Sequence, residues 1–136
     1  MAIRGLFDRS ALILKKSMDL RLQNQQVISS NIANAETPGY AVKRLEFTEE
    51  LRQAVQSRPT DLACTHPDHL PYRGETLEQV QGKVVEYPDQ TGVGDGNSVN
   101  VDEEMILLTE NQVLYEATTQ LLNKKLSILK YTIQGQ

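Results

Sequence analysis

Four side chains that can bind a metal ion lie close together in the middle of the chain. The segment CTHPDHLP, residues 64–71, contains a thiol, two imidazoles and a carboxylate, on Cys64, His66, Asp68 and His69. Thiolate, imidazole and carboxylate groups are the ligands that zinc takes in proteins. Two prolines stiffen the segment, however, and no second group of ligands follows elsewhere in the chain. We therefore expect a turn with exposed imidazoles and no bound metal.

Other short motifs that could carry chemistry are incomplete. GVGDG, residues 92–96, supplies the glycines of a phosphate-binding loop but not its Gly-Lys-Ser/Thr ending. DGNSVNVDEE lacks the ligand and glycine pattern of a calcium-binding loop. Paired carboxylates occur only at residues 49–50 and 102–104, where they suit the positive ends of helices. Because no serine or cysteine can be matched with a base, we expect no enzyme, no cofactor and no small-molecule substrate.

The composition limits the classes to which the chain can belong. Its 136 residues suit one domain, and 39% of them are hydrophobic. The net charge of −4 argues against a nucleic-acid-binding protein, which needs a basic face. The single cysteine allows no internal disulfide, and no stretch reaches the ~20 apolar residues of a membrane span. We expect neither a cleaved signal peptide nor a direct membrane span.

The first element that could position functional residues is a long helix, expected from Phe7 to Asn34. Apolar residues recur at intervals near seven, and no glycine or proline interrupts the run. This pattern is typical of an amphipathic helix that buries one face. The predicted helix-packing residues are Leu6, Ile13, Leu20 and Val27.

A second long helix is expected over residues 101–136. Asn100 and Glu103 fit a capping pair, and the acidic residues that follow Asn100 suit the first turn of a helix. Two adjacent rows of apolar residues then repeat at seven, which is typical of a helix that packs on another helix. Because this double row is wider than one partner can cover, we expect apolar surface to remain for neighbouring copies. The predicted packing residues are Leu107, Leu108, Leu114, Tyr115, Leu121, Leu122, Ile128 and Leu129.

Residues 41–100, between the two helices, form an irregular middle region. TEELRQAVQ, residues 48–56, predicts a short helix with Thr48 as its N-cap. KVVEY, residues 83–87, predicts a strand, and residues 89–100 predict a loop. The chain thus divides into an N-terminal helix and turn at 1–40, this middle region, and a C-terminal helix at 101–136. We expect one mainly α domain, with the terminal helices paired as a coiled-coil-like hairpin and short β segments between them.

An unusual motif ends the first helix. SSNIANAETPGY, residues 29–40, carries Asn31 and Asn34 where a soluble helix normally has Lys, Glu or Leu. Asparagine weakens a helix because its amide competes for backbone hydrogen bonds. Pro38 then disfavours further helix and Gly39 permits positive φ, while Tyr40 can bury its ring and bond a neighbour through its hydroxyl. We expect a stop and turn, with the two amides bonded to its backbone or to another chain.

The motif closely resembles the N-terminal signature of the flagellar basal-body rod, hook and related axial proteins. Further segments resemble the proximal rod members of that family, so the resemblance covers almost the whole chain: ETPGYAVKRLEF, THPDHLP, DGNSVNVDEE and ENQVLYEATTQLLNKKLSILK. The residues to which the resemblance assigns the signature and assembly role are Asn31, Ile32, Asn34, Thr37, Pro38, Gly39 and Tyr40.

The resemblance implies a structural subunit of the bacterial flagellar basal body, in the proximal rod. Such proteins leave the cell through the flagellar type III apparatus without signal cleavage. They polymerise helically into a periplasm-spanning drive shaft and export channel that serves motility. The implied partners are other copies of the chain, other rod proteins, the hook–basal-body protein FliE, the membrane ring and the export gate. The alternative is a helical-hairpin adaptor or export-chaperone-like binding module, which should be a well-folded monomer or dimer.

Overall fold

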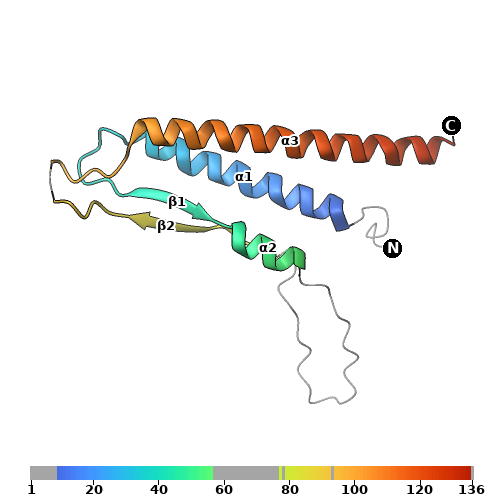
Figure 1. Cartoon of the computed structure of the whole chain (residues 1–136), viewed down its shortest axis with the longest axis horizontal. Helices are drawn as coiled ribbons and strands as arrows, with labels where there is room; N and C mark the ends of the chain where they lie inside the picture. Colours follow the sequence, from blue (N-terminus) through green and yellow to red (C-terminus); the bar gives the residue numbers. More distant parts are fainter. Residues whose placement is uncertain (1–8, 57–76, 78, 93, 136) are drawn as a thin grey trace, which may run out of the picture.

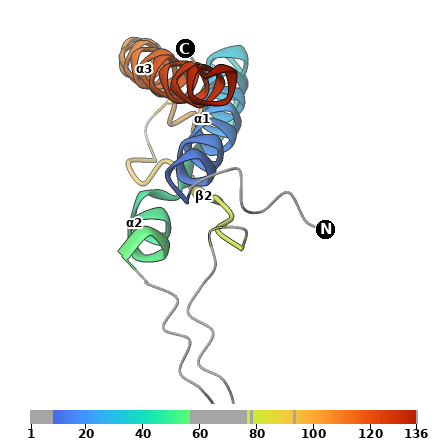
Figure 2. The same cartoon turned by 90° about the vertical axis from the view of Figure 1, so that its right-hand side faces the viewer.

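Two layers make up the chain in the computed structural model, which describes residues 9–56, 77, 79–92 and 94–135. Two long helices lie side by side and run in opposite directions in the first layer (Figure 1). A two-stranded antiparallel sheet and a short helix form the second layer, on one side of the helix pair (Figure 2). The elements are α1 (Arg9–Ala33), β1 (Val42–Glu46), α2 (Thr48–Gln56), β2 (Lys83–Tyr87) and α3 (Val101–Gln134). The predicted mainly α architecture is confirmed.

The two long helices begin and end where local signals place them. α1 contains no glycine or proline and ends ahead of Pro38. α3 begins after Asn100, whose side chain accepts hydrogen bonds from the backbone N–H groups of Asp102 (3.1 Å) and Glu103 (3.5 Å). Its 34 residues span about 50 Å, whereas the 25 residues of α1 span about 38 Å. The C-terminal turns of α3 therefore extend beyond α1 (Figure 1).

The second layer contains one predicted strand and one strand that is not predicted. β1 and β2 pair antiparallel, with Val42 opposite Tyr87 and Glu46 opposite Lys83. β2 and α2 occupy the predicted residues, but the predicted N-cap of α2 is wrong by one position. Thr48 is already helical, and the Leu51 N–H donates to the carbonyl of Phe47 (2.9 Å), so the cap position falls on Phe47.

The apolar core lies between α1 and the second layer. Leu20 of α1 is 1% exposed and packs with Phe47, Ala54 and Val80. Partly buried leucines surround this cluster: Leu45, Leu51 and Leu77. The predicted pairing of the long helices is confirmed, but Leu20 packs against the second layer rather than against α3. The buried residues of α3 are instead polar: Glu104, Asn111 and Thr118.

Candidate functional site

The turn that follows α1 is held by its own polar groups and by the loop before α3. The Asn34 side-chain amide donates to the carbonyl of Ser30 (2.8 Å), and the Thr37 hydroxyl donates to Asn34 Oδ1 (3.2 Å). Gly39 has φ 71°, and its N–H donates to the carbonyl of Asp95 (2.9 Å). The positive φ predicted for Gly39 is confirmed. A residue with a Cβ is strained in this region of φ, which explains the glycine.

Asn97, in the loop before α3, bonds carbonyl groups of the turn that follows α1. Its Nδ2 lies 2.9 Å from the carbonyl oxygen of Asn34, 2.8 Å from that of Ala35 and 2.9 Å from that of Thr37. The carbonyls of Asn34 and Thr37 also accept backbone N–H bonds, from Thr37 (3.0 Å) and Tyr40 (3.2 Å), so the Asn97 amide gives them a second donor. Asn97 Oδ1 accepts from the Val99 N–H (2.8 Å), which orients the amide. The sequence does not single out Asn97, because an asparagine in a glycine-rich loop is common.

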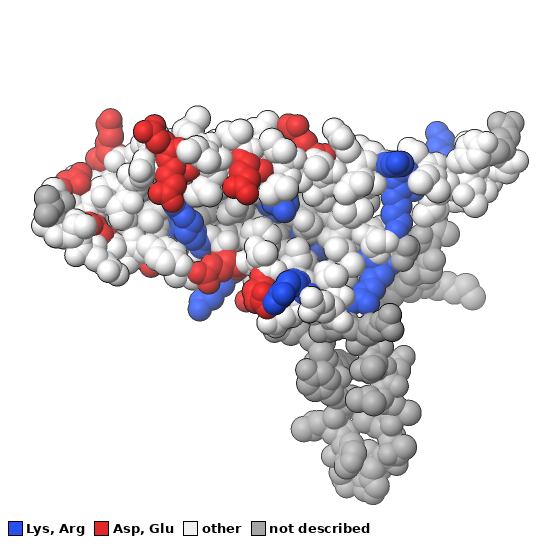
Figure 3. Space-filling view, viewed as in Figure 1, with Lys and Arg blue, Asp and Glu red and all other residues white. Residues whose placement is uncertain are grey.

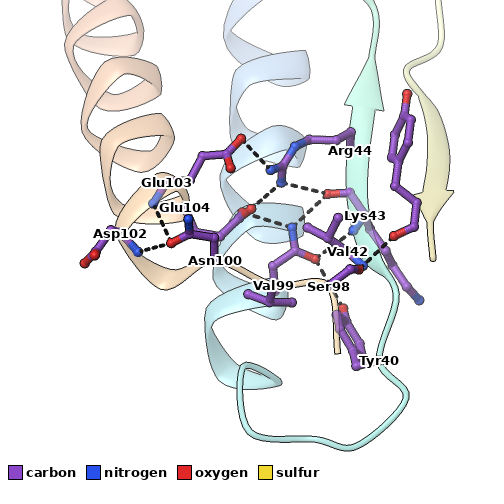
Figure 4. Close-up of polar contacts among 12 residues, drawn as sticks. Tyr40, Val42, Lys43, Arg44, Ser98, Val99, Asn100, Asp102, Glu103 and Glu104 are labelled. Carbon is purple, nitrogen blue, oxygen red and sulfur yellow. Dashed lines mark hydrogen bonds and ion pairs between the residues drawn. The ribbon is translucent and has the colours of Figure 1, made fainter. Parts of the chain in front are cut away.

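Asn31 is the centre of a network that joins α1, β1 and α3. Figure 4 shows Lys43 and Arg44 of β1 beside Glu104 of α3. Its side chain is fully buried. Asn31 Oδ1 accepts from the Lys43 N–H (3.0 Å), and Asn31 Nδ2 donates to the Lys43 carbonyl (2.8 Å) and to Glu104 Oε2 (3.0 Å). The amide therefore bonds both backbone groups of one residue of β1, as a neighbouring strand would. The sequence predicts that Asn31 bonds the backbone of the turn or of another chain, whereas it bonds the backbone of β1.

Glu104 is a buried carboxylate at the start of α3. It contacts Arg44 Nη1 of β1 as well as the Asn31 amide, and Arg44 Nη2 lies 3.5 Å from Glu103 Oε1. A buried carboxylate is stable only when its charge is paired and its oxygens accept hydrogen bonds. Because Arg44 and Asn31 meet both needs, Glu104 connects the first turn of α3 to the second layer. Neither Arg44 nor Glu104 belongs to the predicted signature.

Tyr40 leads the chain from the turn into β1. Its hydroxyl donates to Asn31 Oδ1 (3.3 Å) and lies 3.4 Å from Ser30 Oγ, and its carbonyl accepts from the Ser98 N–H (3.1 Å). The Ser98 hydroxyl in turn accepts from the Val42 N–H (2.8 Å) and donates to the Tyr87 carbonyl (2.7 Å), so it bridges the last residue pair of the two strands. The predicted hydroxyl bond of Tyr40 is present, with partners in the same chain.

A separate surface feature is an exposed apolar row on α3, which we call the outer row: Leu114, Leu121 and Ile128. These side chains are 39%, 57% and 60% exposed, respectively. The parallel predicted row is half-buried: Leu108, Tyr115, Leu122 and Leu129. Figure 3 shows acidic side chains over the first half of α3 and basic ones toward its C-terminal end, with uncharged surface between them. The outer row therefore leaves apolar surface exposed along α3.

Comparison with known proteins places these features in a family. Residues 17–40 match the family model described as flagella basal body rod protein. Over 130 residues the chain is 30% identical to the flagellar basal body rod protein FlgB of Aeromonas hydrophila, and the match covers 96% of each chain. The chain belongs to the family of flagellar basal body rod proteins. FlgB of Salmonella typhimurium and FlgB of Escherichia coli are each 28% identical to it, over 94% of this chain and 95% of their own.

As a member of the rod protein family, the chain is a structural subunit of the flagellar basal body rod. The segment that matches the family model includes Asn31 and Tyr40, whereas their partners Lys43, Ser98 and Glu104 lie beyond it. The family signature thus supplies one side of the network, and the rest comes from β1 and from the segment around the start of α3.

The remaining predicted residues lie in different environments. In the signature, Asn31 is buried, whereas Thr37, Pro38 and Gly39 are exposed, and the half-buried members are Ile32, Asn34 and Tyr40. Ile13, Val27 and Leu107 are also half-buried. Leu6 and the four candidate metal ligands at residues 64–69 lie outside the described residues. Within the described part, no three potential ligand side chains form a group suited to a metal ion. The helices described there are also not long and apolar enough to cross a membrane.

Proposed function

We propose that the chain polymerises helically, with itself and with other rod proteins, through the outer row of α3. The exposure of Leu114, Leu121 and Ile128 carries this proposal. Fully burying one such side chain contributes about 1.5–3 kcal/mol, so burying the exposed half of each contributes roughly 1 kcal/mol. Contacts of this size are weak singly but add up when every subunit of a polymer repeats them. The role is structural rather than catalytic.

The proposal includes a position in the proximal rod, within the periplasmic space. The chain is exported by the flagellar type III apparatus without a cleaved signal peptide, and it contacts FliE, the membrane ring and the export gate. The likeness to FlgB proteins over almost the full length of the chain supports this position. The signature turn from Asn31 to Tyr40 supports it further, because a subunit of a tube must leave the inner helical layer at a defined residue.

Substitution of Leu121 by aspartate tests the assembly surface. Leu121→Asp places a charge in a row that assembly would bury, which costs several kcal/mol per contact and should abolish rod assembly and motility. Gln120→Asp adds the same charge at the adjacent exposed position and should assemble normally. Both variants should keep wild-type helix content by circular dichroism, and both should still be exported.

The results separate assembly from the other functions. Normal rods in Leu121→Asp, or equal defects in the two variants, would refute the outer row as an assembly surface. A wild-type chain that stays a monomer or dimer, and never enters basal bodies, would favour the adaptor or export-chaperone alternative.

A further inference from the structure

Three polar contacts join α1 to α3 at regular intervals. Asn31 Nδ2 donates to Glu104 Oε2 (3.0 Å), Asn24 Nδ2 donates to Asn111 Oδ1 (3.3 Å), and Lys125 Nζ contacts Ser10 Oγ. A step of seven residues forward on α3, from Glu104 to Asn111, matches a step of seven backward on α1. The next contact lies fourteen residues further on each helix. We call these six residues the polar seam.

The interval of seven is the repeat of a coiled coil, so the polar seam follows one face of each helix. The spacing leaves one step between Asn111 and Lys125, where it places Thr118 opposite Ser17. Thr118 is 9% exposed and Ser17 is half-buried, as this position requires. Asn111 also donates to the carbonyl of Arg21 (2.9 Å), which ties its amide to the α1 backbone. The seam therefore extends along most of α1.

Polar groups at such a seam stabilise the pair less than leucines would, but they discriminate between registers. The apolar rows of α3 cannot do so, because they repeat every seven residues and look alike after a shift by one repeat. A shift of that size would separate Glu104 from Asn31. Arg44 lies in β1, which the Asn31 amide holds against α1, so Glu104 would lose this partner as well. An unpaired buried carboxylate makes the shifted pair unfavourable.

We propose that the polar seam selects the pairing of α1 with α3 of the same chain in a single register, and so leaves the outer row for contacts with other chains. The selecting residues are the amides of Asn24 and Asn111 together with Glu104. This inference concerns pairing within one chain, so it does not depend on the assignment to the rod.

Cysteine cross-linking tests the register in the full-length chain with Cys64→Ser. Ser17→Cys with Thr118→Cys reports the observed register, and Ser10→Cys with Thr118→Cys reports a shift by seven residues. With the seam otherwise intact, the first pair should form an intrachain disulfide and the second should not. Both pairs are measured on the purified chain and on chain assembled in basal bodies.

The same two reporters are then placed in a chain whose central seam residues are apolar. Asn24→Leu with Asn111→Leu should raise the yield of the shifted cross-link about tenfold, within the range by which coupled polar contacts bias an equilibrium. Gln23→Leu with Gln112→Leu is the matched control, because it adds two leucines at adjacent exposed positions and should keep a single register. Asn24→Ala with Asn111→Ala removes the same amides without added apolar surface, so the test does not depend on the solubility of the leucine variant.

Three results would overturn the proposal. The first is equal yields of the two cross-links when the seam is intact. The second is failure of the Ser17–Thr118 cross-link in both the purified and the assembled chain. The third is a yield of the shifted cross-link that rises in neither the leucine nor the alanine variant. A loss of motility with unchanged cross-links would instead concern the rod assignment.

Discussion

Replacing Arg44 with methionine should strongly destabilise the chain, because it removes the charged partner of a buried carboxylate. The Glu104 side chain is 0% exposed and contacts both Arg44 and Asn31. Removing one partner of a buried ion pair costs about 3–5 kcal/mol of folding free energy. The Arg44 side chain is 26% exposed, and the Asn31 amide remains as a donor. We therefore expect the lower end of the range, about 3 kcal/mol.

Urea unfolding of the full-length chain, followed by circular dichroism, measures this loss. With a urea dependence of about 2 kcal/mol per molar, the midpoint of Arg44→Met should fall by about 1.5 M. Lys43→Met is the matched control. Lys43 lies next to Arg44 in β1 and forms a surface ion pair with Glu86 of β2 (3.3 Å). Surface pairs contribute about 0–1 kcal/mol, so this midpoint should move by less than about 0.5 M.

A double variant shows whether the uncompensated charge causes the loss. Glu104→Gln keeps the size of the side chain and an oxygen for the Asn31 amide, but it removes the charge. Combined with Arg44→Met, it should recover at least about 1 kcal/mol of the loss, because no unpaired buried charge remains. Strict additivity of the two substitutions, or a midpoint shift in Arg44→Met no larger than that of Lys43→Met, would refute the reasoning.

Two further predictions concern the turn after α1. Gly39→Val should destabilise the chain by about 1–2 kcal/mol because φ 71° strains a β-branched residue, although no atom lies within 4 Å of an added Cβ. Pro38→Ala should destabilise the chain less than Gly39→Val does. If cells with Gly39→Val swim like wild type, with rod assembly scored separately, the argument from φ is contradicted. Asn97→Ala removes the donor shared by three carbonyls and should cost about 1–2 kcal/mol. An unchanged thermal midpoint would show that water replaces the amide without loss.

Local signals predict much of this fold because they act over a few residues. The Asn100 cap indicates the start of α3, and the lack of glycine and proline together with the Pro38-Gly39 stop delimits α1. The apolar run KVVEY predicts β2, and the acidic first turn predicts α2. In each case the residues that decide the structure lie within or next to the element itself.

Features that depend on distant partners are not predictable in this way. β1, with the sequence VKRLE, has two adjacent charged residues and becomes a strand because it pairs with β2 and with the Asn31 amide. Asn97 bonds carbonyls sixty or more residues earlier in the chain. Nothing near residue 97 indicates that partner. The buried carboxylate of Glu104 is likewise hidden among the acidic residues that any helix start favours.

The polar seam shows why periodicity alone does not identify the face by which α3 pairs. Several rows of α3 repeat at seven, and the apolar rows are the natural choice when the helix is considered alone. The choice is made by α1, because Leu20 is buried against the second layer while Asn24 and Asn31 face α3. α3 therefore meets a polar partner and buries Glu104, Asn111 and Thr118. Its outer row stays exposed as a consequence, so the surface that we propose for assembly follows from the apolar face that α1 already uses within the chain.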